Sequence, residues 1–258
     1  MNVPTKSELT EKFFTLGLCS FKYNQEVVYY AMVNNTKILG IKNMFWRFSG
    51  FGLLIMVLIV EVVLADDWSP WNRDKALAAL DSSYAQERRK GLGRLAEIGQ
   101  HRDVPHMLKL LWDDDFFVRG MAEQSIWGLW MRANDPLVDP LFQTAIEYIS
   151  HDKIKEGIDA LNRVILAKPE FAEAWSRLGD AYMHLGDYEQ ALRNYQQALE
   201  FNQYHFGVME SCASIWLERQ DLRKAAVWFR QALAINPNLV ASGITLRQIE
   251  EELGADDI

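Results

Sequence analysis

The stretch AEAWSRLGDAYMHLGDYEQALRNY, from Ala172 to Tyr195, decides the fold class of this 258-residue chain. Its apolar residues recur at the spacing of amphipathic helices, with large and small side chains at set positions. Small residues at Gly179 and Ala191 let two paired helices approach closely, and the large residues fill the holes beside them. The stretch therefore predicts a helical hairpin.

Neighbouring segments repeat this pattern with a period of 34 residues. Val138–Phe171 and Phe206–Leu239 carry comparable residues at the same positions, and Pro169 and Pro237 lie two periods apart. Proline ends the second helix of each pair, because it cannot continue the hydrogen-bond ladder. The middle copy departs from the pattern with Gln203. Three copies are the minimum for a stable stack, so the pattern predicts a helical-repeat array.

The spacing of the repeated residues resembles the tetratricopeptide (TPR) repeat; they are Trp175, Leu178, Gly179, Tyr182, Ala191 and Tyr195. The resemblance implies a solenoid that holds a partner and is rarely a catalyst. Upstream, Asp103 to Arg132 resembles a HEAT repeat, with a fainter copy 31 residues earlier that aligns Arg88 with Arg119.

We therefore expect an all-α, right-handed helical-repeat solenoid. HEAT-like helical repeats cover 66–134 and three TPR repeats cover 135–241. A capping helix (Ser242–Leu253) and an acidic tail occupy 242–258, and we expect one continuous superhelix. The region from Asp66 onward is similar to a group of exported bacterial proteins that join a HEAT-like hairpin to TPR repeats. That resemblance rests on Ala122–Pro136, Ala172–Leu192 and Tyr204–Ala213, and the group has no established activity.

A leader pattern precedes the repeats. Residues 44–65 read MFWRFSGFGLLIMVLIVEVVLA, with a basic residue, an apolar run and small residues before Asp66. We expect cleavage after Ala65 and a mature protein that is periplasmic or secreted. Residues 1–43 are then a mis-assigned start. If Met1 is the true start, 1–43 is a cytoplasmic extension and 44–65 a signal anchor, with the repeats outside the cytoplasm. A buried helix in a cytosolic protein is the remaining alternative.

Charge and cysteine content exclude several functions. The formal net charge of −8 makes binding to nucleic acid or to anionic lipid a poor expectation. Cys19 lies ahead of the leader and Cys212 within the last repeat, so the mature chain has no internal disulfide. We expect Cys212 to be a small buried core residue.

The sequence carries no recognisable catalytic or cofactor motif, so we predict neither an enzyme nor a cofactor. The five histidines lack metal-ligand spacing, and we expect a structural hydrogen bond from His205. The run Asp113-Asp114-Asp115 is interpreted as the acidic start of a helix rather than a metal site. We expect most of the tryptophans to pack in the core, although Trp68 and Trp71 have no obvious core position.

A partner-binding groove can be placed from the repeat frame. In TPR arrays the first helix of each repeat lines the groove at positions two, five, nine and twelve. The predicted groove residues are Asp139, Phe142, Ile146, Ile149, Glu173, Ser176, Asp180, Met183, Glu210, Ser214 and Leu217, with Gly207 beside them. They predict an extended or helical peptide with apolar anchors and a Lys or Arg. The alternative is that the apolar end of this groove packs against the HEAT-like hairpin.

The predicted function is a non-catalytic protein-interaction scaffold or adaptor in the cell envelope, with a protein or peptide partner. A membrane-anchored assembly factor is the first alternative. A homo-oligomer whose groove holds its own capping helix is the second. An envelope enzyme of unrecognised type is the third.

Overall fold

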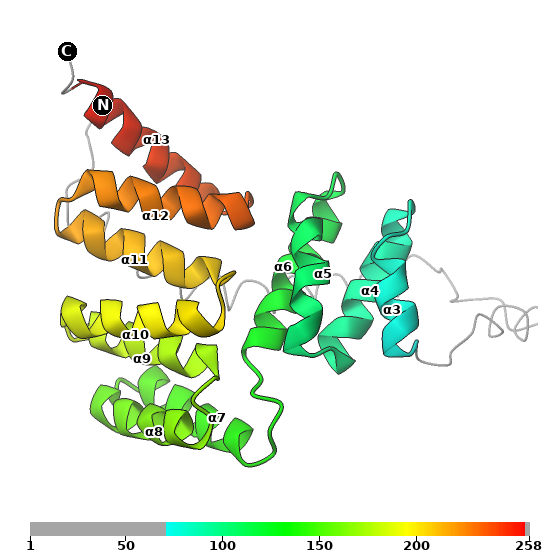
Figure 1. The fold of residues 1–258 in the computed structure, drawn as a ribbon, viewed down its shortest axis with the longest axis horizontal. Coiled ribbons are helices and arrows are strands. Elements are labelled where there is room, and N and C mark those ends of the chain that lie inside the picture. Colours follow the sequence, from blue (N-terminus) through cyan, green and yellow to red (C-terminus); the bar gives the residue numbers. More distant parts are fainter. Residues whose placement is uncertain (1–70, 256–258) are drawn as a thin grey trace, which may run out of the picture. The chain divides into compact units, whose positions relative to one another are not determined.

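In the computed structural model, which describes residues 71–255, every regular element within that range is a helix (Figure 1). The N-terminal helices are α3 (Arg73–Ala79), α4 (Ala85–Ile98), α5 (Val104–Leu108) and α6 (Phe116–Trp130), with short 3-10 turns at His101–Asp103 and Lys109–Trp112. The later helices are α7 (Val138–Ser150), α8 (Ile154–Ala167), α9 (Ala172–His184), α10 (Tyr188–Phe201), α11 (Phe206–Glu218), α12 (Leu222–Ile235) and α13 (Val240–Ala255). The predicted all-α helical-repeat solenoid is confirmed.

Helices α7 to α12 stack as three pairs in regular succession (Figure 1). The first helices begin at Val138, Ala172 and Phe206, which are the starts given by the 34-residue frame. Helix α13 begins one further period on, at Val240, so it takes the position of a first helix, and the described residues end with it. It therefore starts two residues before the predicted Ser242.

The turn within each pair has one geometry. A left-handed residue ends each first helix: Asp152, Gly186 and Gln220, with φ of 59°, 75° and 60°. The N–H of the next residue then returns to a carbonyl five residues earlier, from Lys153 to Tyr148, Asp187 to Tyr182 and Asp221 to Trp216, at 2.9–3.0 Å. Only the middle turn has glycine, the residue to which this φ costs nothing.

Helix pairs pack through the small and large residues of the repeat pattern. A Cβ on Gly179 would collide with the ring of Tyr195, which is fully buried on the partner helix α10. Cys212 is buried in the same cluster as Tyr195, and burial raises the pKa of its thiol to about 12. The expectation that Cys212 is a small buried core residue is thus confirmed.

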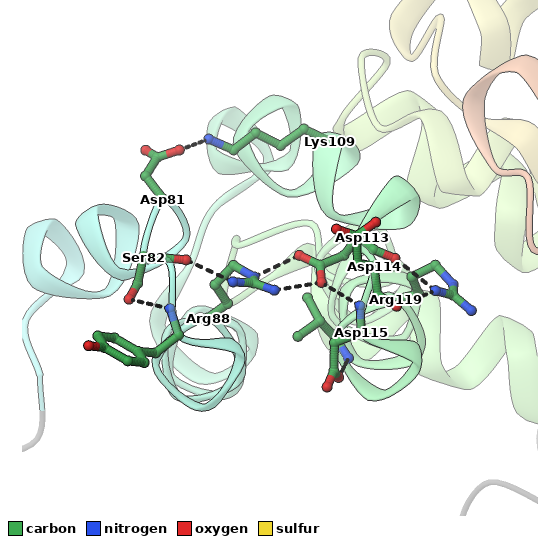
Figure 2. A network of polar contacts seen from close by, with 10 residues as sticks. Asp81, Ser82, Arg88, Lys109, Asp113, Asp114, Asp115 and Arg119 are labelled. Carbon is green, nitrogen blue, oxygen red and sulfur yellow. Dashed lines mark hydrogen bonds and ion pairs between the residues drawn. The ribbon is translucent and has the colours of Figure 1, made fainter.

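A polar network joins the N-terminal helices (Figure 2). The guanidinium of Arg88 on α4 binds the carboxylate of Asp113 at 2.7 Å and donates to the carbonyl of Ser82. Asp115 accepts the N–H of Val118 at 2.9 Å, so it caps the N-terminus of α6. The acidic run is a helix start, as predicted, and no group of metal-ligating side chains occurs within residues 71–255.

Several predictions concern residues outside the described range. These are the extension 1–43, the leader at 44–65 with its cleavage site at Ala65, Cys19, Trp68 and the end of the tail at 256–258. Within residues 71–255, no helix has the length and apolarity that crossing a membrane requires.

Candidate partner-binding site

The predicted groove residues differ widely in exposure. Phe142 is fully buried in the core of the first pair, and Glu173 and Ser176 are also buried. Asp139 is occupied within its own loop, where it accepts the N–H groups of Ala133 and Asp135 at 2.6 and 3.1 Å. The remaining predicted residues are half-buried; they are Ile146, Ile149, Asp180, Met183, Gly207, Glu210, Ser214 and Leu217. This second group and Asp139 keep part of their surface accessible to a partner in this conformation.

Glu173 lies at the centre of a buried ionic network rather than on an open surface. Its carboxylate contacts Arg177 Nη2 at 2.7 Å and His205 Nε2 at 3.0 Å, and only 1% of the residue is exposed. Burial opposes ionisation of Glu173, but the charge of Arg177 and the bond to His205 outweigh it and lower its pKa to about 2. Glu173 is therefore an anion whose charge is already matched within the chain.

His205 makes a structural contact, as predicted. Its Nδ1 accepts the N–H of Val208 at 3.3 Å, which caps α11. That bond leaves the ring proton on Nε2, where it is donated to Glu173. The single ring thus connects the start of one repeat to the first helix of the repeat before it.

Two tryptophans of α6 pack on this histidine. The ring of Trp130 stacks on His205 with centroids 4.6 Å apart, and Trp127 meets the same ring edge-on at 5.4 Å. Both tryptophans also contact Phe206, the first residue of α11. A side chain at Gly207 would collide with Trp127, so this glycine allows the close approach of α6.

Helix α6 and the segment after it contact all three loops that join one pair to the next. In the first loop, Lys168 donates to the carbonyl of Ala133 at 2.6 Å. In the second lies His205, under Trp130. In the third, Asn238 accepts from Arg119 at 2.9 Å and donates to the carbonyl of Leu111 at 2.8 Å. The N-terminal helices therefore cover the side of the stack where first helices begin.

This packing bears on the alternative that the groove packs against the N-terminal helices. Buried residues of α11 and α12, among them Phe206, Met209 and Ala232, share one hydrophobic cluster with α3 to α6. The N-terminal helices thus cover groove positions near the starts of the first helices. The groove positions further along these helices are half-buried. The apolar end at Phe142 is buried against Phe171. The cluster that holds both residues also contains Ala133 from the segment after α6, and the ring of His101 stacks on Phe171 with centroids 6.3 Å apart. This end therefore also contacts the N-terminal part of the chain.

At this contact, two carboxylates form no ion pair with any residue of the described range, 71–255. Glu123 lies on α6 between Arg119 and Trp127, one turn from each, and hence on the face that meets the repeats. Glu210 lies one turn after Phe206 on α11 and accepts a hydrogen bond from Ser242 Oγ. Burial raises the pKa of both carboxyls, that of Glu210 to about 7, and Glu123 contributes to this shift through charge repulsion.

The half-buried residues further along the first helices form a different surface. Asp180 accepts the hydroxyl of Tyr195 at 2.7 Å and contacts Arg177 at 3.3 Å, and about a third of each of these two charged side chains is exposed (32% and 31%). Met183 lies beside the same tyrosine hydroxyl. Asp180 thus keeps exposed surface that a partner can reach, although burial raises the pKa of its carboxyl.

Sequence reasoning did not find the residues that bind α6 to the repeats. Trp127 and Trp130 fit the predicted core spacing, and Trp130 is buried, but their contact with His205 lies about 75 residues away and leaves no periodic signal. Of the other tryptophans, Trp112 breaks the expectation of core packing, because 60% of it is exposed. Trp71 packs against the cluster formed by α3 to α6.

Comparison with known proteins identifies the middle helix pair. Residues 172–205 match the tetratricopeptide repeat. This TPR segment spans α9, α10 and the loop that carries His205. No curated protein sequence matches the chain.

Among solved structures, the chain is similar to the first TPR domain of Spaghetti (RPAP3), solved with the HSP90 peptide SRMEEVD. The identity is 20% and the TM-score 0.43, over 45% of this chain and 93% of that one. A crystal structure of MamA protein gives 18% identity and a TM-score of 0.43, over 64% and 86% of the two chains. At such low values, nothing about partners follows for this chain.

Proposed function

We propose that this chain is a non-catalytic scaffold that holds a protein or peptide partner on the half-buried residues of its first helices. The TPR match at 172–205 supports a protein-interaction role, because repeats of this kind build binding surfaces. The single observation that carries the location is the packing of α6 over the starts of the first helices. That packing leaves the surface around Asp180, Met183, Ser214 and Leu217 for a partner.

The proposed partner is a segment with apolar anchors and a Lys or Arg. Met183 on α9 and Leu217 on α11 keep some apolar surface, and Asp180, one turn before Met183, offers a partly exposed carboxylate. Electrostatic complementarity then selects a cationic side chain. Glu173 is left out of this site, because its charge is already matched by Arg177 and His205.

An in-cell crosslinking pull-down tests this proposal. Ser214→Arg places a cation on the proposed surface, and Gln231→Arg makes the same change at an exposed position of α12 as the matched control. We expect a partner that is recovered with the native protein and the control but lost with Ser214→Arg. Equal recovery with both variants would exclude this surface as the docking site.

We further propose that the protein acts in the cell envelope and that α3 to α6 form a HEAT-like hairpin array. The leader pattern at 44–65 supports the first point. For the second, Arg88 and Arg119, 31 residues apart, both donate to Asp113, one to its carboxylate and the other to its carbonyl. Fractionation of cells separates a cleaved mature form from a membrane-anchored precursor, and a full-length protein in the cytosol would exclude both forms.

A further inference from the structure

The carboxylates of Glu123 and Glu210 lie where two separate parts of the chain meet. Glu123 belongs to α6, and the neighbouring turns of that helix hold Asn238 and His205 through Arg119 and Trp127. Glu210 belongs to α11, one turn after Gly207, where a side chain would collide with Trp127 of α6. The facing surfaces of the two helices thus each contribute one carboxylate.

Neutral groups surround these carboxylates. Ser242 of α13 donates to Glu210, and the fully buried Asn236 in the loop before α13 lies beside Glu123. A hydroxyl donor and a neutral amide side chain beside a carboxyl group do not cancel its negative charge. Two ionised carboxylates in this setting repel each other at low effective dielectric.

The cations nearby are committed to other partners. On α6, Arg119 donates to Asn238 and to the carbonyls of Asp113 and Asp114. On α9, Arg177 pairs with Glu173 and Asp180, and His205 at the start of α11 donates to Glu173. Further along α13 lies Arg247, which is exposed, and Glu250, which pairs with Arg230 of α12. No ion pair reaches Glu123 or Glu210 within residues 71–255.

We propose that Glu123 and Glu210 make the contact of α6 with α11 and α13 a pH-sensitive joint. With at least one of the two protonated, α6 packs closed against the repeats. When both ionise, their repulsion favours local opening of the first turns of α6. Opening exposes Glu210, one of the predicted groove residues, to solvent and to a cationic partner.

The shifts in the pKa of the two carboxyls support a pH-sensitive contact. Burial raises the pKa of both carboxyls, that of Glu210 to about 7, so the closed form binds protons more tightly than an open, solvated form. The closed form is therefore favoured at low pH. It loses that advantage as the pH rises from the usual carboxyl range through neutrality.

Hydrogen exchange of the full chain, read by mass spectrometry, tests the proposal without any partner. Amide protection in α6 is compared at about pH 5.5 and about pH 8.5, after correction for intrinsic exchange, with α8 as the internal reference. We expect protection in α6 to fall roughly tenfold or more relative to α8, following the shift in carboxyl pKa.

Glutamine variants test whether the pH dependence of α6 protection comes from Glu123 and Glu210. Glu123→Gln/Glu210→Gln keeps the hydrogen-bonding shape and removes both charges, so its α6 should lose the pH dependence. Glu156→Gln, at an exposed carboxylate of α8, should keep it. The same pH dependence in the double variant would overturn the proposal. If the double variant loses helical circular dichroism, the native protein alone tests the proposal. Equal protection of α6 in the native protein at both pH values would also overturn the proposal.

Discussion

Two carboxylates on neighbouring first helices show opposite behaviour. Glu173 on α9 is buried and Glu210 on α11 is half-buried, and in both cases burial alone would raise the pKa of the carboxyl. Glu173 meets Arg177 and His205, and its pKa falls to about 2. Among residues 71–255, Glu210 accepts a hydrogen bond from the hydroxyl of Ser242 and is repelled by Glu123, and its pKa rises to about 7. The partner of each carboxylate, rather than its depth of burial, therefore sets its charge state.

The two ends of α6 differ in the same way. Its C-terminal end is held by Trp130 stacked on His205, above the matched charge of Glu173. Its N-terminal half carries Glu123 toward Asn236, with no cation to match it. We therefore expect the contact at Trp130 to be stable at all pH values near neutrality; we call this the firm end. The stability of the contact at Glu123 should depend on pH, and we call this the conditional end.

The largest effect is expected from removing the aromatic contact at the firm end. Trp130→Ala deletes a buried indole that packs on His205 and Phe206, so the free energy of unfolding should fall by about 4 kcal/mol. Urea denaturation measures this change. Trp112→Ala, at an exposed tryptophan, is the control and should cost less than about 1 kcal/mol. Equal losses in the two variants would mean that the stack on His205 does not hold α6.

A smaller loss should follow removal of the matched charge. Glu173→Gln leaves Arg177 and His205 without their buried anion, and we expect about 3 kcal/mol of destabilisation at neutral pH. Because the pKa of Glu173 is lowered, its contribution is present above the usual carboxyl range and is lost as pH falls toward about 2. The variant should therefore lose less stability than the native protein on acidification. A variant as stable as the native protein at neutral pH would refute the role given to this pair.

At the conditional end, removal of a carboxylate should raise the free energy of unfolding instead of lowering it. The raised pKa of Glu210 means that its unfavourable contribution is absent below the usual carboxyl range and complete above about pH 7. Glu210→Gln should therefore stabilise the protein by about 2 kcal/mol at mildly alkaline pH and by much less near pH 5, within the range allowed by the pKa shift. Denaturation curves at the two pH values measure this. Stabilisation that is the same at both would show that ionisation is not its cause.

The smallest effect on stability is expected at the turn within each helix pair. Substitutions in two of these turns compare the α9–α10 pair with the α11–α12 pair. Gly186→Ala places a side chain at φ 75° with no neighbour within 4 Å, so the expected loss of about 1 kcal/mol comes from the backbone alone. Gln220→Gly, at φ 60° in the next turn, should gain up to about 1 kcal/mol. Thermal unfolding measures both. Shifts of the same sign in the two variants would argue against equivalent turns.

The sequence predicts the repeats well because their contacts are local and periodic. Gly179 and Tyr195, which meet in the structure, lie within one 34-residue unit, and the same rule places the starts of α7, α9 and α11. The buried state of Cys212 and the structural role of His205 follow from their positions in that frame.

The packing of α6 could not be predicted in this way. The contact between Trp130 and His205 joins two kinds of repeat, and no period relates one to the other. Without it, Glu173 is indistinguishable from Asp180 in the frame, and both look like exposed groove acids. The structure separates them, since Glu173 is buried and paired while Asp180 keeps exposed surface. Whether the half-buried positions bind a partner remains a prediction.

The most direct test is a carbon-13 NMR titration of the glutamate side-chain carboxyls. We expect one resonance that titrates near pH 2 and disappears in Glu173→Gln, and another that titrates near pH 7 and disappears in Glu210→Gln. Such a result would establish that the neighbouring groups of these two carboxylates give them widely different pKa values. If both resonances titrate together in the usual carboxyl range, at about pH 4 to 5, the contrast between the matched and the unmatched carboxylate does not exist.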